Sequence, residues 1–63
     1  MKRLDLLKIL RAEGCVLVRT VGRHDWWRNL ITGEAQPIPR HREINEITAR
    51  AIIRRLSSPN NNA

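Results

Sequence analysis

Two prolines, Pro37 and Pro39, constrain the topology of any sheet that this chain can form. Residues 34–39 have the character of a short strand despite them, and because the prolines are two positions apart, their missing N–H groups fall on the same side of it. That arrangement is tolerated only where this side of the strand is unpaired, at the edge of a sheet. We therefore expect residues 34–39 to form the last, edge strand of a three-stranded antiparallel meander.

A β-rich stretch at residues 15–20 is expected to form the first strand of this meander. Gly22 marks the turn that follows it. Strand alternation divides the stretch between two faces, with Val16 and Val18 on one and Cys15, Leu17 and Arg19 on the other.

Residues 24–30 are expected to form the second strand, and a turn at Thr32-Gly33 follows it. Alternation points His24, Trp26 and Arg28 to one face and Asp25, Trp27 and Asn29 to the other. The two tryptophans therefore lie on opposite faces, and one of them belongs to the core. The other is either exposed, to stack on a base or to bury in a partner protein, or packed beneath a helix or loop.

Helical patterns stand at both ends of the chain. Leucines at helical spacing predict a helix over residues 3–13, which Gly14 ends. Asn45 caps a second helix over residues 46–56, whose apolar stripe consists of Ala49, Ile52, Ile53 and Leu56. The order is α-β-β-β-α, an α+β fold in which two helices cover one face of the sheet. We expect residues 1–57 to form this single domain and the Asn- and Ser-rich residues 58–63 to form a disordered tail.

The composition excludes several classes of protein. A chain of 63 residues without internal repeats makes one small domain. Its single cysteine rules out an intramolecular disulfide and a Cys-based zinc finger, and it favours a reducing compartment. Its apolar runs are far shorter than the roughly 20 residues of a membrane span, and it has no GxGxxG motif for a dinucleotide. We expect a cytoplasmic protein with no membrane segment and no small-molecule cofactor.

The charge balance points to an acidic partner. The formal net charge is +6, from 12 Lys and Arg against 6 Asp and Glu, and ten of the basic residues are arginines. This excess is typical of proteins that bind nucleic acid or an acidic protein, and arginine favours bidentate contacts with phosphate or carboxylate. A domain of about 60 residues is also marginally stable on its own, so a stable protein partner is plausible.

His24 is the candidate catalytic residue. It follows Gly22, which lets backbone approach a ligand closely, and Arg19, Arg23 and Arg28 can bring guanidinium groups near it. An imidazole can give or take a proton near neutral pH. Beside phosphate-binding arginines it would suffice to cut RNA, because the RNA's own 2′-hydroxyl supplies the nucleophile. The alternative for this histidine is an ordinary surface residue without a function.

The basic surface extends beyond this histidine. His41 lies between Arg40 and Arg42, directly after the third strand. The residues that we expect to contact RNA are Arg19, Arg23, Trp26, Arg28, Arg40 and His41. Three further arginines, Arg50, Arg54 and Arg55, lie off the apolar stripe of the last helix and by default form a solvated face.

We expect no metal site and no thiol nucleophile. His24, Asp25, His41 and Glu43 could gather in principle, but no HxH, HxxxH or DxD spacing brings them together locally. Cys15 lies in a β-rich stretch and is expected to be a small core residue.

Read together, these residues resemble the HicA family of toxin mRNA interferases, the YcfA-like group. The resemblance runs from about residue 3 to residue 57. The matching pieces, in order, are the Leu-rich helix with Gly14, then Leu17-Val18-Arg19, Gly22-Arg23-His24, Ile38-Pro39-Arg40-His41, and a final helix from Asn45-Glu46 that carries Ala49-Arg50-Ala51-Ile52. The family commonly has serine where this chain has Arg23, which leaves the role of a hydroxyl there in question.

The resemblance implies a double-stranded-RNA-binding-domain-like fold, in agreement with the order of elements above. It implies ribosome-independent, metal-free cleavage of mRNA with one catalytic histidine, which corresponds to His24. It also implies a cognate HicB-type antitoxin that binds the toxin and blocks its active site. The family pattern includes a histidine at position 41, whose part in the chemistry stays open.

Two alternatives of other classes remain at this point. A non-catalytic module for double-stranded RNA would use the same fold and charge and would read RNA by shape, with His24 as a groove contact only. A small interaction protein would use its arginines to dock an acidic partner without any nucleic acid. Intact RNA after binding would indicate the first, and absence of saturable RNA binding would indicate the second.

Overall fold

The computed structural model describes residues 1–57, and residues 58–63, expected to be a disordered tail, lie outside the described residues. The elements are α1 (Arg3–Ala12), β1 (Cys15–Val21), β2 (His24–Asn29), β3 (Ala35–Pro39) and α2 (Glu46–Leu56). The strands form one antiparallel sheet in the order β1-β2-β3. The predicted α-β-β-β-α fold is confirmed, and each predicted boundary agrees to within one residue.

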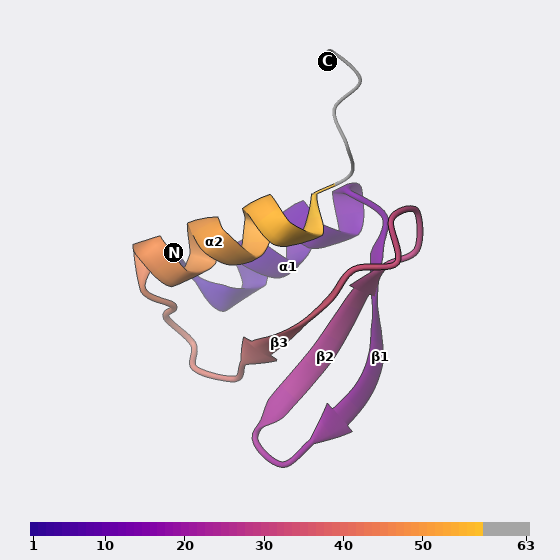
Figure 1. Cartoon of the computed structure of the whole chain (residues 1–63). Helices are drawn as coiled ribbons and strands as arrows, with labels where there is room; N and C mark the ends of the chain where they lie inside the picture. Colours follow the sequence, from indigo (N-terminus) through magenta and orange to yellow (C-terminus); the bar gives the residue numbers. More distant parts are fainter. Residues whose placement is uncertain (58–63) are drawn as a thin grey trace.

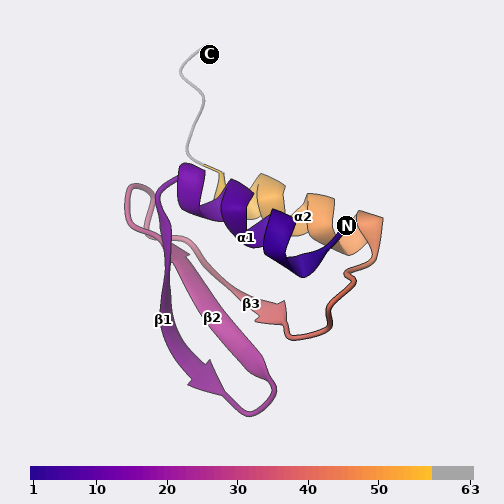
Figure 2. The ribbon, with the colours of Figure 1, turned by 180° about the vertical axis from the view of Figure 1, so that it is seen from behind.

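The two helices lie side by side as one layer over one end of the sheet, and the β1–β2 hairpin extends beyond them (Figures 1 and 2). This arrangement explains the burial along β1, where Cys15 is buried and the other six residues are exposed. Within residues 1–57, neither helix is long and apolar enough to cross a membrane.

The core lies between the helix layer and the covered part of the sheet. Its buried residues are Leu6, Leu7, Leu10, Cys15, Trp27, Ile38, Ile44, Ala49, Ile52 and Leu56. Trp27 is the large sheet residue in it, whereas Trp26 lies on the other face and is half-buried, so the predicted split of the tryptophans is confirmed. Burial raises the pKa of the Cys15 thiol, which donates to the carbonyl of Leu56 at 3.4 Å. Cys15 is the core residue that its sequence context predicts.

Both predicted helix boundaries have the expected local chemistry. Gly14 follows the end of α1 with a φ of +93°, and a Cβ at this position would come within 3.1 Å of Ile31. Asn45 caps α2, since its Oδ1 accepts hydrogen bonds from the backbone N–H groups of Ile47 (2.8 Å) and Thr48 (3.4 Å).

β3 is an edge strand, as its prolines predict. Pro37 lies opposite Trp26 and Pro39 lies opposite His24, while Ile38 and Gln36 alternate with them. Because a proline has no N–H to exchange, hydrogen bonds to β2 must come from the alternate residues. The missing donors therefore lie on the outer side of β3.

The prediction for the faces of β1 is wrong at Arg19. Leu17 pairs with Trp27, but Arg19 pairs with Trp26, because the register shifts between them and leaves Val18 as a bulge. Residues directly opposite each other in an antiparallel pair share a face. Arg19 thus lies on the open face with Trp26, with its guanidinium carbon 5.8 Å from the centre of that ring, and not on the face of Leu17.

The buried side chain of Asn29 joins the ends of three segments. Its Nδ2 donates to the carbonyls of Leu56 (2.7 Å) and Glu13 (3.1 Å). Its Oδ1 accepts from the N–H groups of Ile31 (2.7 Å) and Thr32 (3.2 Å). The amide therefore satisfies backbone groups at the ends of both helices and in the β2–β3 loop.

We expect Asn29→Ala to lower the free energy of unfolding by about 2–3 kcal/mol, because it strips buried backbone groups of their partner. Asn45→Ala, which removes only an exposed helix cap, should lower it by about 1 kcal/mol. Urea denaturation followed by circular dichroism measures both. Equal losses in the two variants would show that the buried amide has no special role.

Candidate active site

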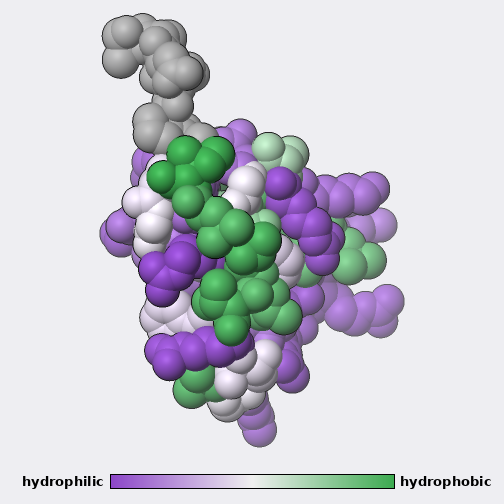
Figure 3. Space-filling model, turned by 90° about the vertical axis from the view of Figure 1, so that its right-hand side faces the viewer, coloured by the Kyte–Doolittle hydropathy of each residue, from purple (hydrophilic) through white to green (hydrophobic). Residues whose placement is uncertain are grey.

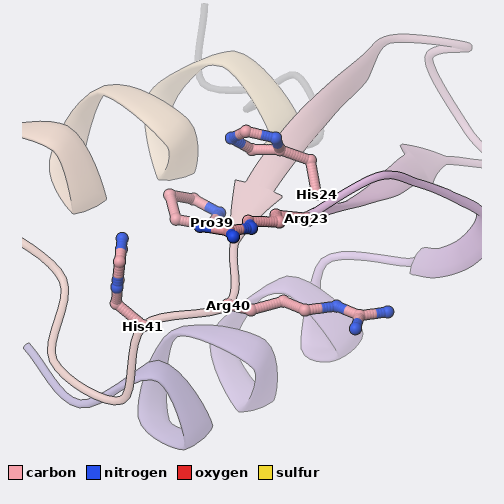
Figure 4. Close-up of a pocket in the computed structure, with 5 residues that line it drawn as sticks. All are labelled: Arg23, His24, Pro39, Arg40 and His41. Carbon is pink, nitrogen blue, oxygen red and sulfur yellow. The ribbon is translucent and has the colours of Figure 1, made fainter.

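One pocket of about 380 Å³ is lined by Arg23, His24, Pro39, Arg40 and His41. All of these except Pro39 are site residues that the sequence predicts. They come from the β1–β2 turn, the first residue of β2, the last residue of β3 and the connector to α2. Figure 4 shows the two histidines flanking the pocket, with Pro39 between them. The sheet thus brings the two histidines, which are distant in sequence, to the same pocket.

Sheet register brings these residues together. Val21 pairs with His24, so the hairpin turn has only Gly22 and Arg23, and Gly22 has a φ of +60°, which favours glycine in such turns. His24 in turn pairs with Pro39 at the end of β3. The tip of the hairpin therefore lies next to the residues that follow β3.

The connector after β3 is held by the start of the chain. Lys2 and Glu43 form an isolated antiparallel bridge, and the N–H of Arg3 donates to the carbonyl of Arg42 at 2.9 Å. This pairing fixes the backbone directly after Arg40 and His41, while β3 fixes it directly before them.

Both imidazoles are exposed, and within residues 1–57 neither makes a hydrogen bond to the protein. The His24 and His41 rings are therefore accessible to a ligand in the pocket and have ring nitrogens available for it (Figure 4).

Asp25 organises the arginines around the pocket. One of its carboxylate oxygens accepts from Nε and Nη2 of Arg40, at 3.1 and 2.9 Å, and from the Thr20 hydroxyl at 2.8 Å. The other accepts from Nη2 of Arg3 at 2.8 Å, and Nε of Arg3 donates to the carbonyl of Pro39 at 2.9 Å. The carboxyl thus ties β1, β2, α1 and the connector together.

This network changes the electrostatics of the site. Hydrogen bonds from Arg40 and Thr20, together with the nearby charges of Arg40 and Arg3, hold the pKa of the Asp25 carboxyl below its usual range, against the opposing effect of burial. Asp25 consequently stays ionised and partly neutralises the two arginines. Arg23 has no such partner in the part of the chain described, so its guanidinium is the available cation of the pocket.

The structure does not bring every expected residue to this pocket. Arg28 donates from Nη1 to the carbonyl of Gly33 at 2.9 Å, and Arg19 covers the ring of Trp26. These three side chains share the open face of the sheet with His24, but they do not line its pocket.

Asp25 and Arg3 are the site residues that sequence reasoning missed. From the sequence, Asp25 is only a metal-ligand candidate without a supporting motif, and Arg3 is only part of a helix. Alternation did put this carboxylate on the helix-covered face, where an acidic group needs a basic partner. It could not tell which of ten arginines would be that partner.

A metal-holding cluster is not found in residues 1–57, where no three His, Cys, Asp or Glu side chains gather closely enough.

Comparison with protein families gives one match. A family model described as HicA toxin of bacterial toxin–antitoxin systems matches residues 4–57, which cover the sheet, the pocket, α2 and all of α1 except its first residue. The comparison with curated proteins and the comparison with solved structures each gave no match.

The lowered pKa of Asp25 gives a prediction for stability at acid pH. Because the pKa in the folded chain lies below that in the unfolded chain, the stabilising contribution is fully present above the unfolded value, near 3.9. It is lost as the pH falls through the folded value. We expect Asp25→Asn to unfold more readily than the wild type at pH 7 and to lose less stability on acidification.

The measurement is a set of urea titrations between pH 7 and the lowest pH at which the wild type still folds. Asp5→Asn, which removes an exposed carboxylate of α1 without touching this network, serves as the control. If Asp25→Asn and Asp5→Asn had the same pH dependence, the network around Asp25 would not stabilise the fold.

Proposed function

The chain belongs to the HicA toxin family of bacterial toxin–antitoxin systems, and on that premise we propose that it is an mRNA endoribonuclease that works without a metal or the ribosome. Family membership makes it a toxin with an antitoxin partner. The proposal adds the reaction, with His24 as general acid or base, and the partner, a HicB-type antitoxin that inhibits it.

The observation that carries the proposal is the accessible imidazole of His24 in a pocket with an unpaired arginine. Arg23 and His24 are adjacent in the chain, and both line the same cavity. A guanidinium can bind a phosphodiester through two parallel hydrogen bonds. A phosphate held by Arg23 would lie within reach of the imidazole, which is the arrangement that proton transfer during phosphodiester cleavage needs.

The reaction needs little more from the protein. The 2′-oxygen of a ribose forms a bond to the adjacent phosphorus, and the bond from phosphorus to the 5′-oxygen of the next nucleotide breaks. A proton leaves the 2′-oxygen and a proton reaches the 5′-oxygen. His24 accepts the first or donates the second and water serves for the other transfer, while Arg23 stabilises the charge on the phosphate oxygens. Arg40, oriented by Asp25, adds positive charge at the pocket rim.

The open face of the sheet offers a surface for the rest of the RNA. Trp26 with Arg19 and Arg28 are on the same face as His24, and His41 borders the pocket on the side of α2. Arginines bind phosphates, and an aromatic ring can stack on a base. We assign these residues to RNA binding and not to the chemical step.

The first test is to incubate the free chain with a long mRNA in the presence of EDTA, beside the His24→Ala variant. We expect the wild type to cut the RNA, and we expect His24→Ala to be slower by at least about 10²-fold, the usual contribution of a general acid or base. His41→Ala should bind RNA less tightly and retain cleavage at saturating RNA.

Circular dichroism checks that the variants are folded. Full cleavage by His24→Ala would overturn the assignment of this residue. Intact RNA in every lane together with a gel shift would instead indicate a non-catalytic RNA-binding module.

A surface for a protein partner supports the antitoxin part of the proposal. We call the exposed aliphatic residues Val16, Leu17, Val18 and Val21, together with Leu30 and Ile31 in the β2–β3 loop, the β1 apolar surface. Figure 3 shows apolar side chains as a continuous green stripe down this side of the molecule. Exposed apolar surfaces of this kind are typical of protein-binding sites.

The backbone supports the same partner. β1 has a neighbour only on its β2 side within the described sheet, so its other edge has backbone groups that a strand of a partner can pair with. β1 also ends at Val21, directly opposite His24. An antitoxin strand added along β1 would end beside the hairpin turn that carries Arg23, one of the residues that line the active-site pocket.

We expect Val18→Lys to weaken inhibition by about 10-fold, because a charge on this surface disrupts strand addition. RNA cleavage by the free variant should be unchanged. The measurement is a titration of cleavage with a HicB-type antitoxin that has first been shown to inhibit the wild type. Ile9→Lys, which changes an exposed aliphatic residue of α1, is the control. Equal inhibition of Val18→Lys and the wild type would remove β1 from the interface.

A further inference from the structure

A second cavity begins at His24 and runs between β3 and α2. It has a volume of about 570 Å³, and its walls include Pro37 and Pro39 of β3 and Ile47, Ala51 and Arg55 of α2. We call it the β3–α2 groove. In Figure 4 the His24 ring lies on the side of Pro39 along which α2 passes.

The two cavities that share His24 differ in chemistry. The active-site pocket is basic, with Arg23, Arg40 and His41 around it. The groove is lined mainly by proline rings and aliphatic side chains, with one arginine. A ligand that spans both needs an anionic group joined to a flat, largely apolar group. A nucleotide has both, as a phosphate and a base.

The prolines argue against a peptide strand in this groove. From the middle of β3 to its end, the N–H groups that would point outward belong to residues 37 and 39, which have none. The outer edge of β3 therefore lacks the ladder donors of residues 37 and 39, on which strand addition beside the groove would depend. The proline rings lie on the side of the sheet that carries His24 and present carbon surface to a ring stacked on them.

The groove also contains polar groups that could read a base. Gln36 and Thr48 line it, and within residues 1–57 neither side chain has a hydrogen-bond partner. A side-chain amide both donates and accepts, as does a hydroxyl, so the pair can bond to the edge of a base. Arg55 adds a cation at the groove margin for a neighbouring phosphate.

We propose that the β3–α2 groove binds the base of the nucleotide adjoining the phosphate on which His24 acts, and that Gln36 and Thr48 set the base preference. This rests on the proposed endoribonuclease function. The groove is thus a specificity subsite, separate from the pocket that carries the chemistry.

The test uses short single-cut RNAs, either intact or with an abasic nucleotide on the 5′ or the 3′ side of the cut. Ala51→Leu fills part of the groove with a good helix former, and Ala12→Leu makes the same change on exposed α1. We expect Ala51→Leu to raise KM on intact RNA by about 10-fold, within the range of lost base stacking. Ala12→Leu should leave KM unchanged.

The abasic substrates distinguish the loss of base binding from a general loss of enzyme activity. An abasic nucleotide on one side of the cut should raise the KM of the wild type, and Ala51→Leu should then have no further effect on that substrate. Gln36→Ala and Thr48→Ala should alter the ranking of the four bases at that position.

Two results would overturn the proposal: the same KM for wild type and Ala51→Leu on intact RNA, or wild-type KM values that do not respond to either abasic nucleotide. If the wild type cuts no RNA, the proposed function fails, and the groove is then tested by fluorescence anisotropy with the same intact and abasic RNAs. Identical affinities in that assay would overturn the groove as a base-binding site.

Discussion

The carboxylate of Asp25 is the interaction on which the arrangement around the pocket depends. Its partners come from β1, from α1 and from the connector after β3, through Thr20, Arg3 and Arg40. In a chain with a net charge of +6, guanidinium groups from two distant segments would otherwise repel one another where the fold brings them together. A single half-buried acid lets the protein concentrate arginine at one end of the sheet, and among the described residues that line the pocket it leaves Arg23 as the arginine without an acidic partner.

Most of the fold follows from local rules that act within a few residues. Gly14 and Asn45 determine helix ends through backbone freedom and a side-chain cap, and Pro37 and Pro39 determine which strand is at an edge. Such features can be recognised in a sequence because their physical cause is contained in it. The bulge at Val18 has no comparable local marker, since it depends on how β1 fits against β2, and so the face of Arg19 was assigned wrongly.

The candidate site was predictable in its residue types and only partly in its geometry. Gly22, Arg23 and His24 are adjacent in sequence, and Arg40 and His41 follow a strand whose end could be located, so both halves of the pocket were recognisable. The hydrogen bonds of Asp25 to Arg3 and Arg40 were not predictable. Which of the ten arginines contact this carboxylate depends on the packing of α1 against the sheet. The groove beyond His24 likewise results from the packing of α2 beside β3, which no sequence motif encodes. Prediction from the sequence therefore reaches the interactions within one helix or strand and does not reach those between different elements.

The two edges of the sheet have opposite properties, and this has a consequence for assembly. β1 has free backbone groups and aliphatic side chains along its length, while β3 has prolines where its outward donors would be. Pairing can therefore extend the sheet in one direction only. Open fibres need each added molecule to offer a new site at its far side, and in this chain the far side lacks the N–H donors of residues 37 and 39. Any complex built through β1 ends after a single addition on each molecule. A small basic protein can therefore keep an exposed strand edge available for a partner without polymerising through it.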